Sequence, residues 1–464
     1  MSDLDYVGSD GLGLVAAIRA RRVSARAVTE AALARAASRG VAVNAFTAVL
    51  ADQARADAER VDGALAAGRE PGPLAGLPFA AKNLFDVAGV TTLAGSRINA
   101  SRPPARRDAA AVAALRRAGA ILIGALNMDE YAYGFTNENG HHGAVRNPHD
   151  PARVAGGSSG GSGAAVGAGL VPLALGSDTN GSVRVPAALC GAFGFKPTYG
   201  RVSRIGCAPL AGSLDHVGAL GRSVRDVTAA FDAMHGPDPE DPVCARRPAE
   251  PCRPVLGQGI DGLRIAVLDG HFARGGEPDV FAAVAAAASA LGVSRRATIP
   301  EAHRARAAAM VITACEGSSN HLDDLKTRPQ DFDPLTRDRF LAGALVPGVF
   351  YQQAQRFRAW YRAQVARLFG EVDVLLAPTT PCPAPRIGQD RMVLDGVEVP
   401  ARASLGLFTQ PLSFIGLPVL SVPVRTGPLP VGVQIIGAPF REAHVLRVGA
   451  LLEAKGVAAA VLAP

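Results

Sequence analysis

Serine and glycine are concentrated in one stretch of the chain, residues 156–186, which reads GGSSGGSGAAVGAGLVPLALGSDTNGSVRVP. The stretch begins with a Gly/Ser block and ends with a second glycine-flanked serine, Ser182. Dense glycine lets backbone N–H groups approach a ligand closely. Two serine hydroxyls on such a backbone suggest acyl transfer, in which one hydroxyl attacks a carbonyl, another relays protons and N–H groups hold the oxyanion.

Three other interpretations of this stretch fit the residues less well. Gly/Ser runs are usually flexible linkers, but a linker is rarely followed at once by an apolar segment such as AAVGAGLVPLALG. Residues 157–161 match the G-x-S-x-G nucleophile elbow, which must follow a buried strand, whereas the preceding RNPHDPARVAG is typical of a loop. The GK[ST] sequence of a phosphate-binding loop is missing from the block.

The use of lysine indicates a base for this chemistry. Of the 48 Lys and Arg residues, only four are lysines, and they are Lys82, Lys196, Lys326 and Lys455. Lys82 lies in AGLPFAAKNLFDVAGV, between apolar and small residues. Arginine keeps its proton in proteins, whereas a desolvated lysine can lose it and act as a base. Lys82 is therefore a candidate catalytic base, with a snorkelling or ion-paired lysine as the alternative.

Taken in order, these segments resemble the amidase signature family. The segments that carry the resemblance are GLPFAAKNLFDVAG (77–90), GGSSGGSGAAVGAG (156–169), GSDTNGSVRVPAALCGAFGFKPTYGRVSR (176–204), FIGLPVLSVPV (414–424) and VGVQIIG (431–437). The resemblance implies an amide hydrolase without a cofactor or metal. Its nucleophile would be Ser182, its base Lys82, and its bridging serine Ser158, held behind a cis Gly157–Ser158 bond. A neutral Lys82 could draw the nucleophile's proton through Ser158 and return it to the departing nitrogen.

The resemblance extends to the loop around the nucleophile. It implies an oxyanion hole made by the backbone N–H groups of Thr179, Asn180, Gly181 and Ser182. It also implies that Asp178 and Arg184 support this loop. Many family members have Gly-Gly-Ser where this chain has Asn180-Gly181-Ser182. Because asparagine tolerates unusual φ values, we expect the loop to form, and the Asn180 side chain is a candidate for substrate contact.

Four further segments resemble one subgroup of the family, which hydrolyses carboxybiuret-type substrates in bacterial cyanuric acid breakdown. These segments are 93–109, 124–151, 321–345 and 350–362. The resemblance implies a small anionic ureido substrate, hydrolysis of its terminal urea-type amide and release of ammonia. It further implies a homo-oligomer and a small helical partner subunit. Arginine forks bind carboxylates well, and the candidates to hold the substrate carboxylate are Arg146, Arg184, Arg201 and Arg204.

Other functions stay open at this point. A component of a glutamine-dependent amidotransferase that acts on charged tRNA would share the fold, although the RPQDFDP segment does not favour it. An amidase for another ureido acid and a non-catalytic binding protein are further alternatives. His141, His142 and His149 share a polar loop with Asp150, which allows a metal site there, a pocket-mouth loop or a solvated one. A Ser-His-Asp triad with Ser182 would need a histidine in a motif context, and none has one.

Composition narrows the partners and the compartment. The net charge is +7 at 464 residues, but the arginines lie among acids, as in ARAVTEAALARAASR. This pattern predicts no nucleic-acid surface. The N-terminal MSDLDYVGSDGLG lacks a signal-peptide pattern, and no apolar run is long enough to predict a membrane span. The six cysteines show no framework or zinc spacing, so we expect a reduced, cytoplasmic enzyme.

The elements that must position these residues alternate along the chain. Ser24 is the expected N-cap of a helix over ARAVTEAALARAASR, and a second helix is expected from Phe46 to Leu65. Another helix is expected around Ala109–Ala118. Buried strands are expected in GLPFAAK, AILIGAL, LRIAVLDG, VDVLLAP, PVLSVPV and VGVQIIG.

This alternation predicts a single α/β domain over residues 1–464, with a mixed central β-sheet covered by helices on both faces. The N-terminal helices would occupy about residues 10–70. The Pro-rich segment 236–259 is expected to be a surface connection and not a domain boundary, since strands of one sheet are predicted on both sides of it.

Overall fold

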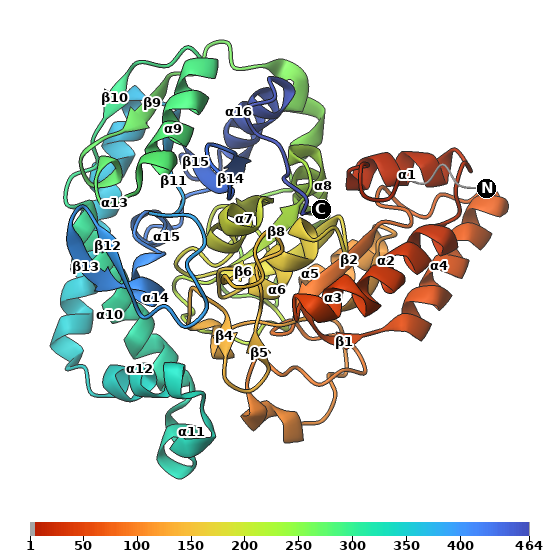
Figure 1. Ribbon diagram of the computed structural model, residues 1–464, viewed down its shortest axis with the longest axis horizontal. Coiled ribbons are helices and arrows are strands. Elements are labelled where there is room, and N and C mark those ends of the chain that lie inside the picture. Colours follow the sequence, from red (N-terminus) through yellow and green to blue (C-terminus); the bar gives the residue numbers. More distant parts are fainter. Residues whose placement is uncertain (1–4, 464) are drawn as a thin grey trace.

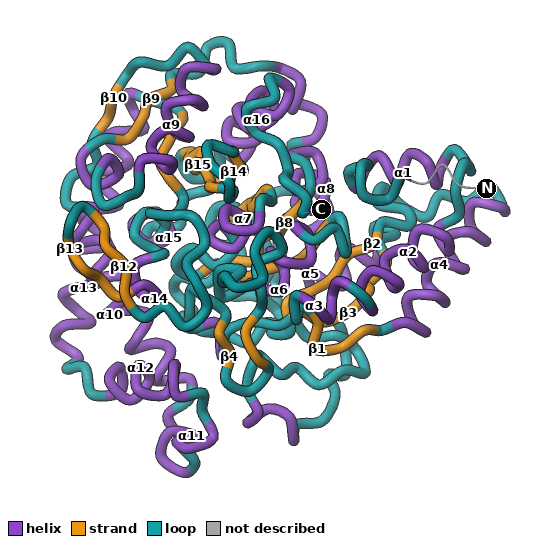
Figure 2. The backbone as a smooth tube through the Cα atoms, viewed as in Figure 1, coloured by secondary structure: helices purple, strands orange, loops and turns teal. Residues whose placement is uncertain are grey.

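Figure 1 shows the computed structural model, which describes residues 5–463. Within these residues, eleven strands form one sheet in the order β1-β3-β2-β6-β8-β7-β14-β15-β11-β9-β10. The bounds along that order are β1 Phe46–Val49, β3 Ile121–Leu126, β2 Pro78–Lys82, β6 Leu173–Asp178, β8 His216–Gly221, β7 Phe193–Lys196, β14 Val419–Val424, β15 Val431–Gly437, β11 Val374–Pro378, β9 Ile265–Leu268 and β10 Arg296–Ala297. Helices surround this sheet on both sides (Figure 2).

Strand direction determines where the chemically interesting residues meet. Strand β2 pairs in parallel with both β3 and β6, with Ala81 opposite Leu175. The carboxyl ends of parallel strands lie at the same edge of a sheet. Lys82 ends β2 and Asp178 ends β6, so the two strands deliver both residues to one edge. The remaining central pairs, from β6/β8 to β11/β15, are antiparallel, and the sheet is therefore mixed.

Alternating side chains bury the two faces of the sheet under different helices. In β3, Ile121 and Ile123 join one apolar cluster while Leu122 between them joins another, as the period of two requires. One cluster lies under α2 Ala25–Ala37, α4 Ala51–Ala66 and α6 Gly160–Gly167. The opposite cluster lies under α5 Ala110–Arg117, α8 Val224–Met234 and α16 Glu442–Ala454.

A second group of helices extends from one end of the sheet, at the lower left of Figure 1. Its members are α10 Ala302–Asn320, α11 Leu322–Thr327, α12 Pro334–Ala344 and α13 Gly348–Glu371. Helix α10 packs against both α12 and α13. This group also carries part of the candidate site, as described below.

The smaller elements complete the chain. The short hairpins pair β4 Glu138–Asn139 with β5 Gly143–Ala144, and β12 Arg391–Leu394 with β13 Val397–Pro400. The remaining α-helices are α1 Gly11–Arg19, α3 Arg39–Ala42, α7 Arg184–Cys190, α9 Pro278–Ala290, α14 Ala401–Ser404 and α15 Gln410–Ser413. The Pro-rich segment 236–259 contains only the 3-10 helix η3 Arg253–Gln258, and strands of the large sheet precede and follow it.

Most elements expected from the sequence are confirmed. Ser24 caps α2, because its side chain accepts a hydrogen bond from the N–H of Ala27 at 3.0 Å. The helix expected around Ala109–Ala118 is α5. Each of the six expected strands is present as a buried strand of the large sheet. The mixed α/β sheet with helices on both faces is the predicted fold class.

One expected element is wrong. The helix predicted from Phe46 to Leu65 begins only at Ala51, and Phe46–Val49 form strand β1. The segment FTAV contains aromatic and β-branched residues that suit a strand. It pairs antiparallel with β3, with Phe46 opposite Leu126. That partner is remote in the sequence, so a helical period read locally could not reveal the pairing.

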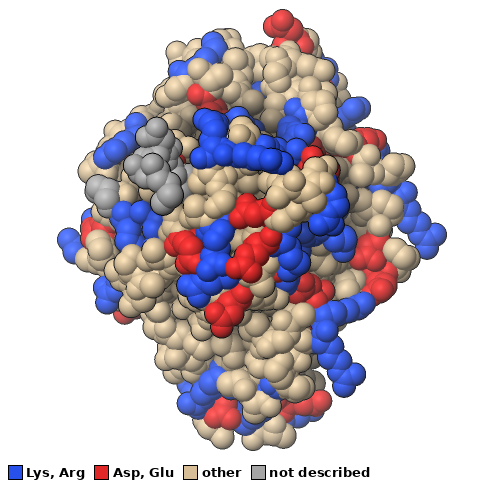
Figure 3. All heavy atoms as spheres, turned by 90° about the vertical axis from the view of Figure 1, so that its right-hand side faces the viewer, with Lys and Arg blue, Asp and Glu red and all other residues tan. Residues whose placement is uncertain are grey.

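Charges on the N-terminal helices are distributed in pairs. Figure 3 shows the face at the right of Figure 1, where basic and acidic side chains lie intermixed. Glu30 of α2 contacts Arg26 at 2.8 Å and Arg55 of α4 at 2.9 Å.

Among residues 5–463, no helix combines the length and apolar character that crossing a membrane would need.

Candidate active site

Lys82 is the centre of the candidate site. Strand β2 ends at this residue, and its side chain is fully buried. The side-chain nitrogen Nζ donates hydrogen bonds to Ser158 Oγ at 2.7 Å and to Ser177 Oγ at 2.9 Å. The structure therefore brings Lys82 and Ser158 together across 76 positions of sequence.

Burial changes the protonation of this lysine. Desolvation lowers the pKa of Lys82 from its ordinary 10.5 to about 7, against the opposing charges of Asp129, Asp215 and Asp178. Removing a charge from water disfavours the ionised form, which for lysine means a lower pKa. A substantial fraction of Lys82 is therefore neutral near pH 7 and can accept a proton.

Ser158 lies just before α6 and follows a cis peptide bond from Gly157. Only glycine fits before it, because a Cβ on Gly157 would lie 2.1 Å from Asp129 Oδ2. The N–H of Asp129 donates to the carbonyl of Ser158 at 3.2 Å. The loop before α6 is thus pressed against Asp129, and this contact holds the Ser158 hydroxyl over Lys82.

The other two serines of the Gly/Ser block point elsewhere. Ser159 Oγ donates to the carbonyl of Ser177 at 3.2 Å, and Ser162 Oγ donates to the carbonyl of Leu175 at 2.8 Å. Both hydroxyls are fully buried against β6. A hydroxyl held on a backbone carbonyl in the core is not available to attack a substrate, so these two serines anchor α6 to the sheet.

Ser182 lies in the loop between β6 and α7 and lines a small cavity of about 20 Å³. One part of the expected relay is not formed: within residues 5–463, no hydrogen bond joins Ser182 Oγ to Ser158 Oγ, whereas Lys82 and Ser158 are in contact. The Lys82–Ser158 half of the expected relay is therefore present, and the Ser158–Ser182 half stays a prediction.

An ion pair between Asp178 and Arg184 joins the two ends of this loop. Arg184 is fully buried and grips Asp178 with Nε on Oδ2 and Nη2 on Oδ1, both at 2.9 Å. Arg184 Nη1 also donates to Gln434 Oε1 of β15 at 2.6 Å. Burial alone would raise the pKa of Asp178, but the Arg184 guanidinium holds it well below its usual range. The ion pair therefore connects both ends of the loop to the neighbouring sheet, as supporting residues would.

The backbone of the loop offers unpaired donors. In the described part of the chain, the N–H groups of Thr179, Asn180, Gly181 and Ser182 donate no hydrogen bond. Gly181 has φ +139°, and a Cβ there would lie 2.2 Å from Thr409 Oγ1. Glycine is required at this position, since other residues would be strained and would collide. Consecutive free N–H groups can stabilise a developing oxyanion.

The side chain of Asn180 is held by a hydrogen bond, and its backbone does not adopt a positive φ. Its Nδ2 donates to Thr313 Oγ1 of α10 at 2.8 Å, and the residue is absent from the positive-φ positions of the described chain. Its Oδ1 is buried without a hydrogen-bond partner among the described residues, and Asn180 lines the cavity. An unpaired buried acceptor is costly, so a substrate N–H donor would satisfy it.

The four arginines expected to hold a substrate carboxylate do not line this cavity. Arg146 is exposed and donates to a backbone carbonyl. Arg184 is buried in its ion pair with Asp178. Arg201 donates to two backbone carbonyls. Arg204 lines an adjoining cavity of about 200 Å³ and contacts a carboxylate at 3.5 Å. The arginine that lines the cavity together with Ser182 is instead Arg339 of α12.

Arg339 is held in place without a carboxylate of its own. Its guanidinium lies 3.8 Å from the centre of the Tyr133 ring, and Nη1 donates to the Tyr133 carbonyl at 2.8 Å. Within residues 5–463, no carboxylate lies within 4.0 Å of it; nearby Asp129 is paired with Arg402 at 3.1 Å. A partly buried guanidinium that has no carboxylate partner among the described residues and lies beside a cavity is suited to bind an anion.

Two residues of the site were missed at the sequence level. Ser177, which contacts Lys82, belongs to the GSDTNGS motif and could have been noticed there. Arg339 stands in LTRDRFLAGAL, two positions after Arg337, and nothing local distinguishes the two. His141 and His149 contact different partners and do not come together at one site. His141 Nε2 lies 3.1 Å from Glu130 Oε1, and His149 Nε2 lies 3.1 Å from the backbone carbonyl of Cys190.

Comparison with known proteins gives consistent matches over nearly the whole chain. The profile of the Amidase family matches residues 27–446. AtzE, a 1-carboxybiuret hydrolase subunit of Pseudomonas sp. (strain ADP), is 53% identical over 448 residues, covering 96% of this chain and 98% of that protein. One subunit of the glutamyl-tRNA(Gln) amidotransferase of Azoarcus sp. (strain BH72) is 41% identical over 466 residues, covering 93% and 94%.

A solved structure matches equally well in three dimensions. It is described as an unexpected vestigial protein complex that reveals the evolutionary origins of an s-triazine catabolic enzyme. It superposes with a TM-score of 0.97 at 52% identity, covering 97% of this chain and all of that chain. The arrangement of the site described above therefore lies on a backbone shared with this relative.

Proposed function

The chain belongs to the amidase signature family of hydrolases, and from this premise we propose that it hydrolyses a C–N bond of a small carboxylated urea-type substrate, such as 1-carboxybiuret, and releases ammonia. The observation that carries this proposal is the contact between Ser158 and Lys82, whose pKa is lowered to about 7. It is joined by a cavity that both Ser182 and Arg339 line. The 53% identity to a 1-carboxybiuret hydrolase subunit supports the substrate class.

In the proposed first step, Ser182 Oγ attacks the carbonyl carbon of the terminal amide. Its proton passes to Ser158, whose own proton passes to the neutral Lys82 Nζ at 2.7 Å. The carbonyl oxygen becomes an oxyanion and accepts hydrogen bonds from the free N–H groups of residues 179–182. The tetrahedral intermediate collapses when Lys82 returns the proton, through Ser158, to the departing nitrogen, and ammonia leaves.

In the proposed second step, water enters the position of the departed ammonia. Lys82, again neutral, draws a proton from this water through Ser158, and the hydroxide attacks the acyl carbon. The ester bond to Ser182 breaks, and the serine oxygen recovers its proton along the same path. No cofactor takes part in these steps, and the acid and base are the same lysine in its two protonation states.

Arg339 is the proposed partner of the substrate carboxylate. It is the basic side chain that lines the Ser182 cavity, and among the described residues no aspartate or glutamate lines it. Glutamine carries an α-ammonium group as well as a carboxylate, and the lining of this small cavity holds no carboxylate for the ammonium. The adjoining cavity of about 200 Å³ is lined by Asp215 and Asp241 as well as by Arg204, so the charge of the lining alone does not separate the two substrates. The lower identity of 41% makes the amidotransferase the second candidate.

A homo-oligomer and a small helical partner subunit remain part of the proposal as well. They are supported by the relative of known structure, which is described as a protein complex. The turn between α12 and α13 and the start of α13 expose apolar side chains that such a contact could cover, namely Leu345 at 81%, Val349 at 64% and Phe350 at 52%. Light scattering on the purified chain, alone and co-expressed with a candidate subunit, would test both statements.

Replacement of Arg339 by glutamine tests the substrate proposal. A charge-assisted hydrogen bond contributes about 1.5–3 kcal/mol, so kcat/KM for 1-carboxybiuret should fall about 10- to 100-fold. The same variant should hydrolyse neutral biuret as the unaltered enzyme does, because biuret has no carboxylate to bind. The measurement is ammonia release with carboxybiuret, biuret, glutamine and an aliphatic amide under one condition.

A matched control is available on the same helix. Arg337→Gln removes a half-exposed arginine that pairs with Asp338 and should leave all four rates unchanged. Equal losses for carboxybiuret and biuret in Arg339→Gln would show that Arg339 is only structural. If the aliphatic amide or glutamine is the best substrate of the unaltered enzyme, the carboxylated-urea proposal is wrong even though the hydrolase chemistry stands.

A further inference from the structure

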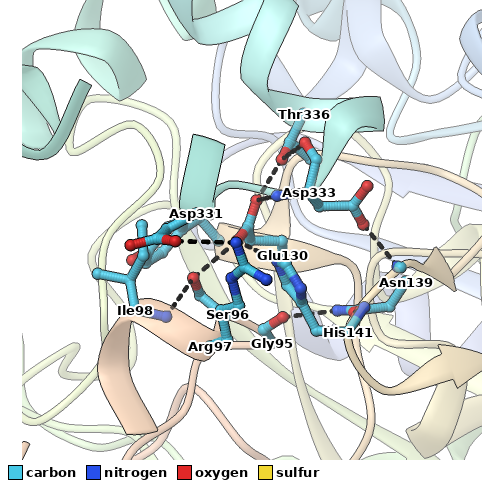
Figure 4. A network of polar contacts seen from close by, with 12 residues as sticks. Gly95, Ser96, Arg97, Ile98, Glu130, Asn139, His141, Asp331, Asp333 and Thr336 are labelled. Carbon is cyan, nitrogen blue, oxygen red and sulfur yellow. Dashed lines mark hydrogen bonds and ion pairs between the residues drawn. The ribbon is translucent and has the colours of Figure 1, made fainter. Parts of the chain in front are cut away.

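Glu130 is a buried carboxylate that the proposed mechanism does not use. Its side chain is fully buried, and Figure 4 shows donors converging on it from several segments. Its Oε1 accepts from Ser96 Oγ at 2.6 Å and lies 3.1 Å from His141 Nε2. Its Oε2 accepts from the N–H of Asp333 at 2.8 Å and from the hydroxyl of Thr336. One carboxylate thus joins three segments that are distant in sequence.

A second carboxylate extends this network to the first turn of α12. Asp333 Oδ1 accepts from the N–H of Leu335 at 2.9 Å and caps the helix, while Oδ2 accepts from the N–H of Gly140 at 2.8 Å. Outside the core, Arg97 pairs with Asp331 at 2.8 Å, as Figure 4 also shows. The start of α12 is therefore fixed to the β4–β5 hairpin and to the loop before it.

Glu130 is connected to both structures that hold Arg339, namely helix α12 and Tyr133. Arg339 follows Thr336 by three positions on α12, so the two lie one turn apart on the same side of the helix. Tyr133, which Arg339 contacts through its ring and its carbonyl, follows Glu130 by three positions in the 3-10 turn Glu130–Ala132 and its C-cap. Displacing the Glu130 carboxylate would shift the helix that carries Arg339 and the wall against which Arg339 rests.

We infer that Glu130 is a positioning residue that holds the Arg339 guanidinium at the distance from Ser182 that a carboxylated substrate requires. The inference rests on the proposed function, in which Arg339 binds the substrate carboxylate. Burying an ionised carboxylate is unfavourable unless several donors surround it. The chain meets that condition, and two of the donors, the N–H of Asp333 and the hydroxyl of Thr336, belong to the start of the helix that carries Arg339. A misplacement of about 1 Å in such a contact can lower a rate substantially.

The experiment is a double-mutant cycle between Glu130 and Arg339, measured as KM and kcat with carboxybiuret and biuret. Glu130→Ala should raise KM for carboxybiuret by about 10-fold or more and leave kcat/KM for biuret within about twofold. In the Arg339→Gln background, Glu130→Ala should cause no further loss with carboxybiuret, because the group that it positions is gone. Glu130→Gln should recover most of the affinity, since its amide oxygen can accept from Asp333 and its NH2 can donate to Ser96 and His141.

Thr336→Val provides the same test if Glu130→Ala does not fold. This change keeps the shape of a buried residue and removes only the hydroxyl that reaches Glu130. It should also raise KM for carboxybiuret selectively, and the effect should vanish without Arg339. Additive losses in the cycle, or equal losses for carboxybiuret and biuret, would overturn the inference. If Arg339→Gln alone has no selective effect, the carboxylate proposal fails instead, whatever Glu130 does.

Discussion

Ser182→Ala is expected to lower kcat for amide hydrolysis by at least about three orders of magnitude, as loss of a nucleophile does in other serine hydrolases. Alanine has no oxygen to attack the carbonyl, and the Thr179 hydroxyl, which also lines the cavity, is held by Asp215 at 2.6 Å. The Ser182 hydroxyl makes no hydrogen bond within residues 5–463, so the free energy of unfolding should change by less than about 0.5 kcal/mol. Ammonia release and a thermal unfolding curve on the same sample measure the two quantities.

Ser159→Ala and Ser162→Ala are the matched controls for this prediction. Their hydroxyls hold backbone carbonyls of β6, so these variants should lose stability and keep an acylated Ser182. Mass spectrometry of the enzyme quenched during turnover identifies the acylated peptide. An adduct on Ser159 or Ser162, or substantial turnover by Ser182→Ala, would show that the nucleophile is misassigned.

Lys82→Arg is expected to be nearly as inactive as Lys82→Met, with losses of about 100- to 10,000-fold in kcat. Arginine preserves the positive charge but cannot lose a proton in a protein. Methionine preserves much of the shape in this fully buried site and removes the basic nitrogen. Comparing kcat of the two variants separates proton transfer from simple electrostatics. An active arginine variant would show that Lys82 acts only through its charge.

The lowered pKa of Lys82 predicts how the activity of the unaltered enzyme depends on pH. Burial lowers the pKa of Lys82 to about 7, and only the neutral amine accepts a proton. Activity should therefore be constant above about pH 8 and fall about tenfold per pH unit well below about pH 7, because the neutral fraction falls in that proportion. A profile of kcat/KM from about pH 5 to about pH 9 measures this. A flat profile across that range would contradict the assignment of Lys82 as the base.

Lys82, Ser158 and Ser182 could be proposed from the sequence because each lies in a short motif that resembles those of the family. Ser158 and Ser182 each follow a glycine, Gly157 and Gly181, at which a Cβ would collide with the surroundings. Long apolar runs such as VGVQIIG likewise predict buried strands without reference to their neighbours. The motifs therefore indicated the candidate residues and the glycine-rich loops that present the two serines.

Which side chains meet was decided only by the tertiary structure. Strand β1 forms because β3 offers it an edge, and the helical period of the following residues concealed this. Ser177 reaches Lys82 because β6 lies beside β2 in the sheet. Neither pairing can be read from a local pattern, since each joins segments that are remote in the chain.

The arginines illustrate the same division most clearly. Arg184, Arg204 and Arg339 each stand near apolar residues, and nothing in the local sequence shows which of them has a carboxylate partner. The fold gives the first two a carboxylate and, among the described residues, leaves Arg339 without one beside the cavity of Ser182. Whether a charge is free to bind substrate depends on partners supplied by distant segments. Local sequence thus determined which groups can do the chemistry, while packing between remote elements determined which charge faces the cavity.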